Sequence, residues 1–151
     1  MENVNNYISM EGINLLVRNG NLKSEIAQEY RNIISKEIER RVDTHNIKSN
    51  LYISMTDVNT LVRNSNLKME VAQSYRNLVA LEVEEIIDTN SFKEGFYVSV
   101  EDINILSRYG NVKPERAQAY RNLVASEIEK VIDSYKEDNS VKVKTITPIN
   151  K

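Results

Sequence analysis

The sequence predicts an all-α protein made of three tandem copies of one helix-turn-helix hairpin, and three observations lead to that expectation. Shifting the chain by 45 residues aligns residues 7–45 with 52–90 and with 97–135 without a gap. Each aligned segment carries apolar residues at helical spacing on both sides of a short turn. That turn contains Gly20 in the first copy and Gly110 in the third. We therefore expect six main helices, stacked as a short array or closed into a compact bundle.

The similarity between the copies is too high to arise by chance, because 16 of the 39 aligned positions hold the same residue in all three. In the numbering of the first copy these residues are Tyr7, Ser9, Asn14, Leu16, Arg18, Asn21, Lys23, Glu25, Ala27, Gln28, Tyr30, Arg31, Asn32, Glu37, Glu39 and Asp43. Most of them are polar or charged, whereas Ile, Val and Leu exchange freely at the apolar positions. Core packing alone would preserve apolar residues, so the identical polar residues indicate specific hydrogen bonding or binding.

The first helix of each copy is expected to begin directly after a serine. Ser9, Ser54 and Ser99 occupy this place, and serine side chains bind exposed N–H groups at helix starts. Asp57 and Asp102 follow three residues later in the second and third copies, as an acidic variant of the capping box. The helix is then expected to end at the turn, where glycine readily adopts the left-handed conformation.

The second helix is longer and is expected over residues 24–43, 69–88 and 114–133. Its apolar residues fall on one broad face in each copy. In the first copy they are Ala27, Tyr30, Ile33, Ile34, Ile38 and Val42. Glu37 lies within this apolar arc, and a buried carboxylate needs a partner, for which Arg18 or Arg31 is the expected candidate.

Residues 1–135 are expected to form one domain, and residues 136–151 a C-terminal tail. The linkers 46–51 and 91–96 are short and polar, so neighbouring copies should pack against each other. Within the tail, residues 141–147 alternate between apolar and polar side chains before Pro148. This alternation predicts a strand-like segment, and a flexible tail is the alternative.

The composition excludes most enzyme classes. The chain has 151 residues, one histidine, no cysteine and 20 basic against 22 acidic side chains. It has no thiolate nucleophile and no Cys-based zinc site, and the lone His45 cannot form a two-His metal site, a pair of proton shuttles or a Cys-His pair. No phosphate-binding glycine loop or EF-hand loop is present. We expect no catalytic residues, no cofactor and no metal site, and therefore no enzyme.

No apolar stretch reaches the roughly 18 residues that a membrane helix needs, so no membrane partner is expected. The polar N-terminus also lacks the basic and apolar regions of a signal peptide. Together these features predict a cytoplasmic protein.

The candidate partner-binding surface is an arc of identical polar residues on the second helix of each copy. Aromatic, Arg and amide side chains of this kind are common at protein interfaces. The residues are Gln28, Arg31, Asn32, Gln73, Arg76, Asn77, Gln118, Arg121 and Asn122. The alternative is that this arc packs on the next copy and bonds its helix ends and linkers.

A second candidate is a basic patch formed by the turns. Its residues are Arg18, Lys23, Arg63, Lys68, Arg108 and Lys113. If the copies stack in parallel, these cations would form a stripe that could follow a phosphate backbone. The alternative is that they bond helix carbonyls and the acidic helix ends of neighbouring copies.

These features predict a non-catalytic helical-repeat protein that binds another macromolecule, with a protein favoured, as an adaptor, inhibitor or regulator. The alternative is a nucleic-acid-binding regulator that uses the basic turns. Self-association also fits, because a stacked array without polar terminal caps exposes its ends.

Overall fold

A computed structural model describes residues 7–47, 52–92 and 97–146, with side chains up to Asp138. This part of the chain contains six helices and no strand, so the all-α prediction is confirmed. The helices are α1 (Met10–Arg18), α2 (Ser24–Thr44), α3 (Met55–Arg63), α4 (Met69–Thr89), α5 (Val100–Arg108) and α6 (Pro114–Ile146). Parts of the two predicted linkers, residues 48–51 and 93–96, lie outside the described residues.

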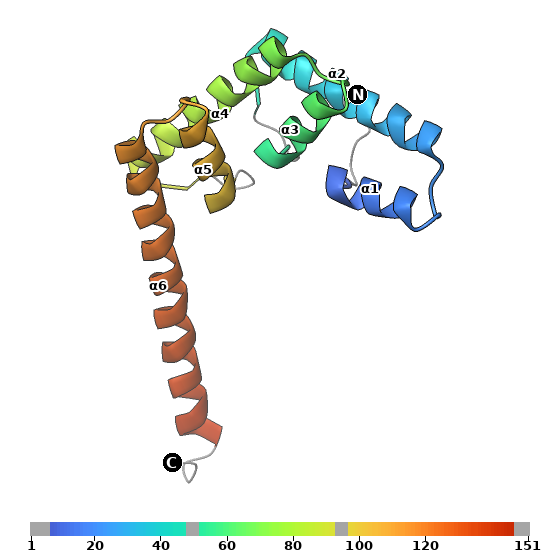
Figure 1. The fold of residues 1–151 in the computed structure, drawn as a ribbon. Helices are drawn as coiled ribbons and strands as arrows, with labels where there is room; N and C mark the ends of the chain where they lie inside the picture. The colour runs from blue at the N-terminus through green and yellow to red at the C-terminus, as the bar shows by residue number, and fades with distance from the viewer. Residues whose placement is uncertain (1–6, 48–51, 93–96, 147–151) are drawn as a thin grey trace.

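The six helices form three pairs that follow one another in a row (Figure 1). Each short helix packs on the long helix that follows it, and α4 packs on both α2 and α6. The row is curved, and the short helices α1, α3 and α5 all lie on the same side of the long helices α2 and α4 (Figure 1). The arrangement is therefore a stacked array, with the first and third pairs at opposite ends.

The short helices begin as the sequence predicts. The hydroxyl oxygen of Ser9 accepts a hydrogen bond from the N–H of Gly12 at 3.0 Å, and Ser54 and Ser99 make the same bond at 3.1 Å. At the turn after α3 the backbone has a positive φ of 66° at Ser65, where the other two turns have glycine. A non-glycine residue adopts this conformation at some cost, so the turn keeps its shape despite the substitution.

The buried core runs through all three pairs and follows the predicted helical periodicity. Ala27, Ile34 and Ile38 of α2 are fully buried, as are Ala72, Val79 and Val83 of α4. On α2, Ile33 of the predicted apolar face departs from this pattern, since it is 40% exposed. The buried stripe of α2 passes through Ile34 and Ile38 and leaves Ile33 on its margin.

Glu37 is buried as predicted, but its partners are different. Its carboxylate accepts hydrogen bonds from Arg41 Nε at 2.9 Å and from Arg40 Nη2 at 2.6 Å. The prediction of Arg18 or Arg31 was wrong, because residues three and four positions later on the same helix reach the carboxylate directly. Burial raises the pKa of Glu37, but the bonds from Arg40 and Arg41 outweigh it and hold that pKa below its ordinary value.

The prediction of a strand-like segment is wrong for residues 141–146, because α6 continues as a helix to Ile146, while a flexible tail stays a prediction. The long helices α2 and α4 end at His45 and Asn90, which adopt the left-handed conformation, whereas α6 passes its corresponding residue, Tyr135, without a break. An isolated strand would have no partner for its backbone groups, while a helix satisfies them internally. Residues 147–151 lie outside the described residues.

Candidate protein-binding surface

Hydrogen bonds join each helix pair to the next at corresponding positions. The hydroxyl of Tyr52 donates to Asp102 Oδ2 at 2.7 Å, and Tyr7 donates to Asp57 in the same way. Asp57 also accepts a hydrogen bond from the backbone N–H of Met10 at 3.1 Å, so the same carboxylate binds an N–H group at the N-terminus of α1. Burial raises the pKa of both Asp57 and Asp102, although the tyrosine hydroxyls partly offset it. These contacts are structural, because both partners of each bond belong to neighbouring helix pairs and hold them together.

Asparagine side chains make a second recurring junction on the other side of the array. Asn66 Nδ2 donates to Asn32 Oδ1 at 2.7 Å, and Asn111 Nδ2 donates to Asn77 Oδ1 at 2.6 Å. Both bonds join residues 34 positions apart. Asn32 and Asn77, two of the three predicted partner-binding asparagines, thus bond to the next pair. This agrees with the alternative that the polar arc packs on the next copy.

The predicted glutamines and arginines form a clamp within each pair. Arg31 Nη1 donates to Gln28 Oε1 at 2.7 Å, while Arg31 Nη2 donates to Asn14 Oδ1 of α1 at 2.9 Å. The equivalent bonds recur around Arg76 and Arg121. This clamp ties the short helix to the long helix and explains why these polar residues are identical. Binding of a partner by the same residues stays a prediction.

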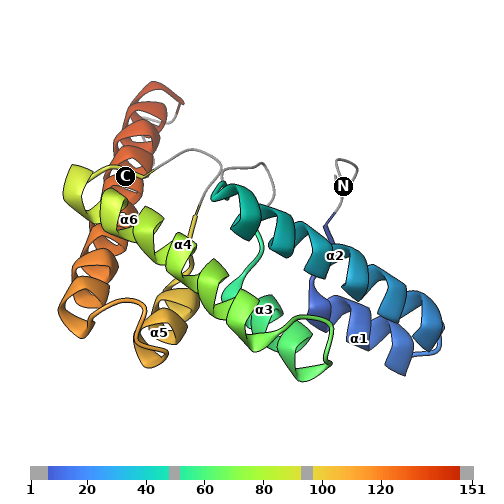
Figure 2. The same ribbon diagram turned by 90° about the horizontal axis from the view of Figure 1, so that it is seen from above.

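The six predicted basic turn residues are all exposed. The three turns follow one edge of the molecule (Figure 2). Exposed acids directly follow the turns, since Glu25, Glu70 and Glu115 lie in the first turns of the long helices. Each turn therefore carries two basic residues and one acidic residue, so acids interrupt the basic stripe, and nucleic-acid binding stays a prediction.

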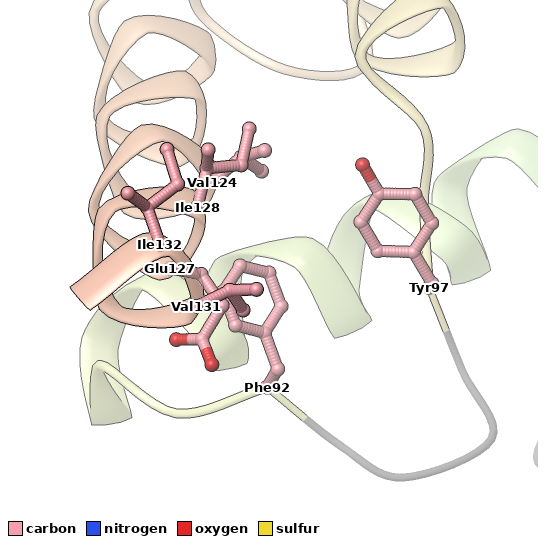
Figure 3. Close-up of a pocket in the computed structure, with 7 residues that line it drawn as sticks. All are labelled: Phe92, Tyr97, Val124, Glu127, Ile128, Val131 and Ile132. Carbon is pink, nitrogen blue, oxygen red and sulfur yellow. The ribbon is translucent and has the colours of Figure 1, made fainter. Parts of the chain in front are cut away.

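The most distinctive surface is one that the sequence analysis did not find. A groove of about 410 Å³ opens at the end of the array formed by the third helix pair. Figure 3 shows α6 along one side of it, with Phe92 and Tyr97 on the opposite side. The lining residues are Phe92, Tyr97, Val124, Glu127, Ile128, Val131 and Ile132.

Comparison with the other helix pairs shows why the groove is open. Ile128 is 53% exposed, whereas Ile38 and Val83 at the corresponding positions are fully buried. Val131 is 61% exposed, whereas its counterpart Ile86 is fully buried. The long helices α2 and α4 each have a following long helix packed on them, and within the described residues α6 has none. The groove is thus the same face that the earlier pairs bury against their neighbours.

The periodicity of the sequence could not separate this face from its buried counterparts, because it assigns the three copies the same apolar positions. The difference arises from packing between pairs, since within the described residues no further long helix packs on α6 as α4 packs on α2 and α6 on α4. The polar residue at the rim is Glu127, whose counterpart Glu37 is buried and paired.

No other chemical centre is evident in the part of the chain that the structure describes. Among those residues, no group of three or more His, Asp or Glu side chains could hold a metal ion. None of the helices there is both long and apolar enough to cross a membrane. Comparison with protein families, curated proteins and solved structures finds no match to this chain.

Proposed function

We propose that this protein is a non-catalytic binding protein, and that it binds another protein through the groove at the end of its third helix pair. The observation that carries this proposal is the exposure of Ile128 and Val131 at positions where the second pair fully buries Val83 and Ile86. Removing such residues from water supplies the main favourable free energy of protein association. The single histidine and the lack of cysteine in the sequence support the non-catalytic part.

The chemistry of the groove favours a protein over a nucleic acid. Aromatic and aliphatic side chains line it, as in the centre of protein interfaces. The adjoining stretch of α6 carries three exposed acids, Glu127, Glu129 and Asp133, against one exposed base, Lys130, and this net negative charge would repel a phosphate backbone. The fitting partner is an amphipathic helix or helix pair, since α2 and α4 bury this same face against helices. A binding protein of this kind would act as an adaptor, inhibitor or regulator.

The test compares two substitutions of an exposed apolar residue by aspartate. Ile128→Asp places a charge in the groove, while Leu81→Asp does the same on α4, where Leu81 is 66% exposed and outside the groove. Proteins captured from the producing cells by the wild type are identified, purified and titrated against both variants. We expect Ile128→Asp to weaken binding by at least about tenfold and Leu81→Asp to leave it unchanged. Equal affinity of the wild type and Ile128→Asp for every captured protein would contradict the proposal.

The same experiment includes a nuclease arm that tests the nucleic-acid alternative. If the turns bind nucleic acid, nuclease treatment removes the captured material and binding falls steeply with salt. The triple variant Lys23→Glu, Lys68→Glu and Lys113→Glu would then also lose binding, whereas Ile128→Asp would not. That pattern would replace the groove with the basic turns as the functional surface.

A further inference from the structure

We infer that the occupant of the groove is the first helix pair of a second copy of this chain, so that the chains associate head to tail. This inference rests on the proposed function, because it names the partner of the same groove. Inside the chain, each helix pair packs on the pair before it and covers the face that corresponds to the groove. We call the covering surface, which faces the preceding pair, the front face. The second copy would continue this stacking beyond the third pair.

The first helix pair exposes the apolar face that such an association requires. Leu16 is 38% exposed, whereas Leu61 and Leu106 at the corresponding positions are fully buried. Leu15 is 41% exposed, while its counterparts Thr60 and Ile105 are each 7% exposed. What differs between these positions is contact with a preceding helix pair, which α3 and α5 make and which α1 does not make within the described residues.

The long helix α2 adds two apolar residues to this front face. Ile26 is 48% exposed and Ile33 is 40% exposed. At the position of Ile26 the third pair carries Arg116, whose guanidinium bonds to Glu84 and Asp88 of α4. That position therefore faces the preceding long helix, so Ile26 would face α6 of the other copy.

The asparagine junction has one unused half at each end of the array. Asn122 corresponds to the acceptors Asn32 and Asn77, and Asn21 corresponds to the donors Asn66 and Asn111. Both Asn21 and Asn122 are exposed, and within the described residues neither side chain makes a hydrogen bond. Head-to-tail stacking would pair Asn21 of one copy with Asn122 of the other, by the same bond that recurs twice inside the chain.

Two junction contacts cannot form between copies, and their loss sets the strength of the association. Ile26 stands where Arg116 bonds to Glu84 and Asp88, so the corresponding Glu129 and Asp133 would meet no cation. Gly12 stands where Asp57 and Asp102 accept the tyrosine hydroxyls, so Tyr97 would meet no carboxylate. The contact between copies is therefore weaker than the junctions within the chain and reversible. Because the two faces are different, the contact is heterologous and produces open oligomers or rings rather than a symmetric dimer.

The experiment blocks each end in a separate full-length protein and then mixes the two. Ile128→Asp blocks the groove, and Ile26→Asp blocks the front face with a charge that suits the first turn of a helix. Sedimentation equilibrium should show concentration-dependent oligomers for the wild type and monomers for each variant alone. The mixture should form a heterodimer and nothing larger, because only one competent pair of faces remains. Leu81→Asp serves as the control and should associate like the wild type.

Two outcomes overturn the inference. One is a wild type that stays monomeric up to about 1 mM, above the dissociation constants of most weak complexes. The other is self-association of either blocked variant alone, because that requires a symmetric contact at the remaining end. Circular dichroism verifies the fold, and Val131→Lys replaces Ile128→Asp if the latter does not fold. A monomeric wild type whose groove still binds a captured protein would overturn only this inference and leave the proposed function standing.

Discussion

The hydroxyl of Tyr52 donates a 2.7 Å hydrogen bond to Oδ2 of Asp102, joining residues 50 positions apart in the chain. Tyr7 and Asp57 make the equivalent bond one helix pair earlier. Both carboxylates are buried, so each bond satisfies a polar group that water cannot reach. These bonds tie one pair to the next and account for the tyrosine of the first two copies, whereas Tyr97 of the third makes no such bond within the described residues.

Replacing Tyr52 by Phe should lower the free energy of unfolding by about 1–2 kcal/mol, because the buried Asp102 carboxylate loses a hydrogen bond. Urea denaturation measures this loss. The control is Tyr97→Phe, which removes the corresponding hydroxyl at a side chain that is 54% exposed. Equal losses in the two variants would show that the bond between pairs contributes no specific stability.

The buried tyrosines should make the protein unfold in alkali. Burial raises the pKa of Tyr7, Tyr52 and Tyr75, and raises that of Tyr120 to about 12. Groups with a raised pKa in the folded state contribute stability that is complete below the unfolded pKa of about 10 and is lost as pH rises above it. Stability should therefore fall steeply above about pH 10. Ultraviolet absorbance of these tyrosinates should rise together with the loss of helical circular dichroism, and ionisation that precedes unfolding would contradict their burial.

Breaking the buried ion pair of α2 should destabilise the first helix pair. Arg41→Ile, which installs the residue found at position 86, leaves Glu37 with only Arg40 and should cost about 2–3 kcal/mol. The lowered pKa of Glu37 means that the pair contributes stability above the unfolded pKa and loses it as pH falls. The difference between wild type and variant should thus shrink in acid. A loss that stays constant with pH would point to packing rather than charge.

Gly12→Asp should strengthen the association between copies, because it supplies the carboxylate that Tyr97 lacks. A Cβ atom at position 12 would lie 3.3 Å from atoms of Ile8 and Ser9, which is a tight contact. The fold accommodates it, because Asp57 and Asp102 occupy the corresponding positions of the other two pairs. We expect an association about 5–10-fold tighter than that of the control Gly12→Ala, which tests helix propensity alone. Adding Tyr97→Phe should abolish the gain, and a gain that survives would assign it to another cause.

Local signals in the sequence predicted most of the fold. The serine caps, the turn glycines and the periodicity of the long helices depend on neighbours a few residues away, and they located all six helices. The tail was misjudged because the alternation in residues 141–146 resembles a strand, yet a strand needs a partner that no local pattern can guarantee. The partners of Glu37 were misassigned for a different reason, because its local neighbours Arg40 and Arg41 were overlooked. Arg31 is instead held by Asn14 and Gln28.

The candidate site was the least predictable feature, because it is a property of position in the array. Ile128 and Val83 occupy equivalent places in the pattern, and only the presence of a following pair buries one of them. The identical polar residues looked like a binding surface from the sequence. In the structure, those of the clamps and of the asparagine junctions mainly hold the helices and the pairs together.

The most direct test of the account is a disulfide cross-link between Asn21→Cys in one copy and Asn122→Cys in another, since the natural chain contains no cysteine. Asn32→Cys with Asn66→Cys in one chain is the positive control, because those asparagines are bonded at 2.7 Å. In an equimolar mixture under mild oxidation, we expect mixed dimers well above the half that random pairing gives. Mixed dimers at the random fraction, alongside an efficient internal cross-link in the control, would contradict docking of one chain's first helix pair into another's groove.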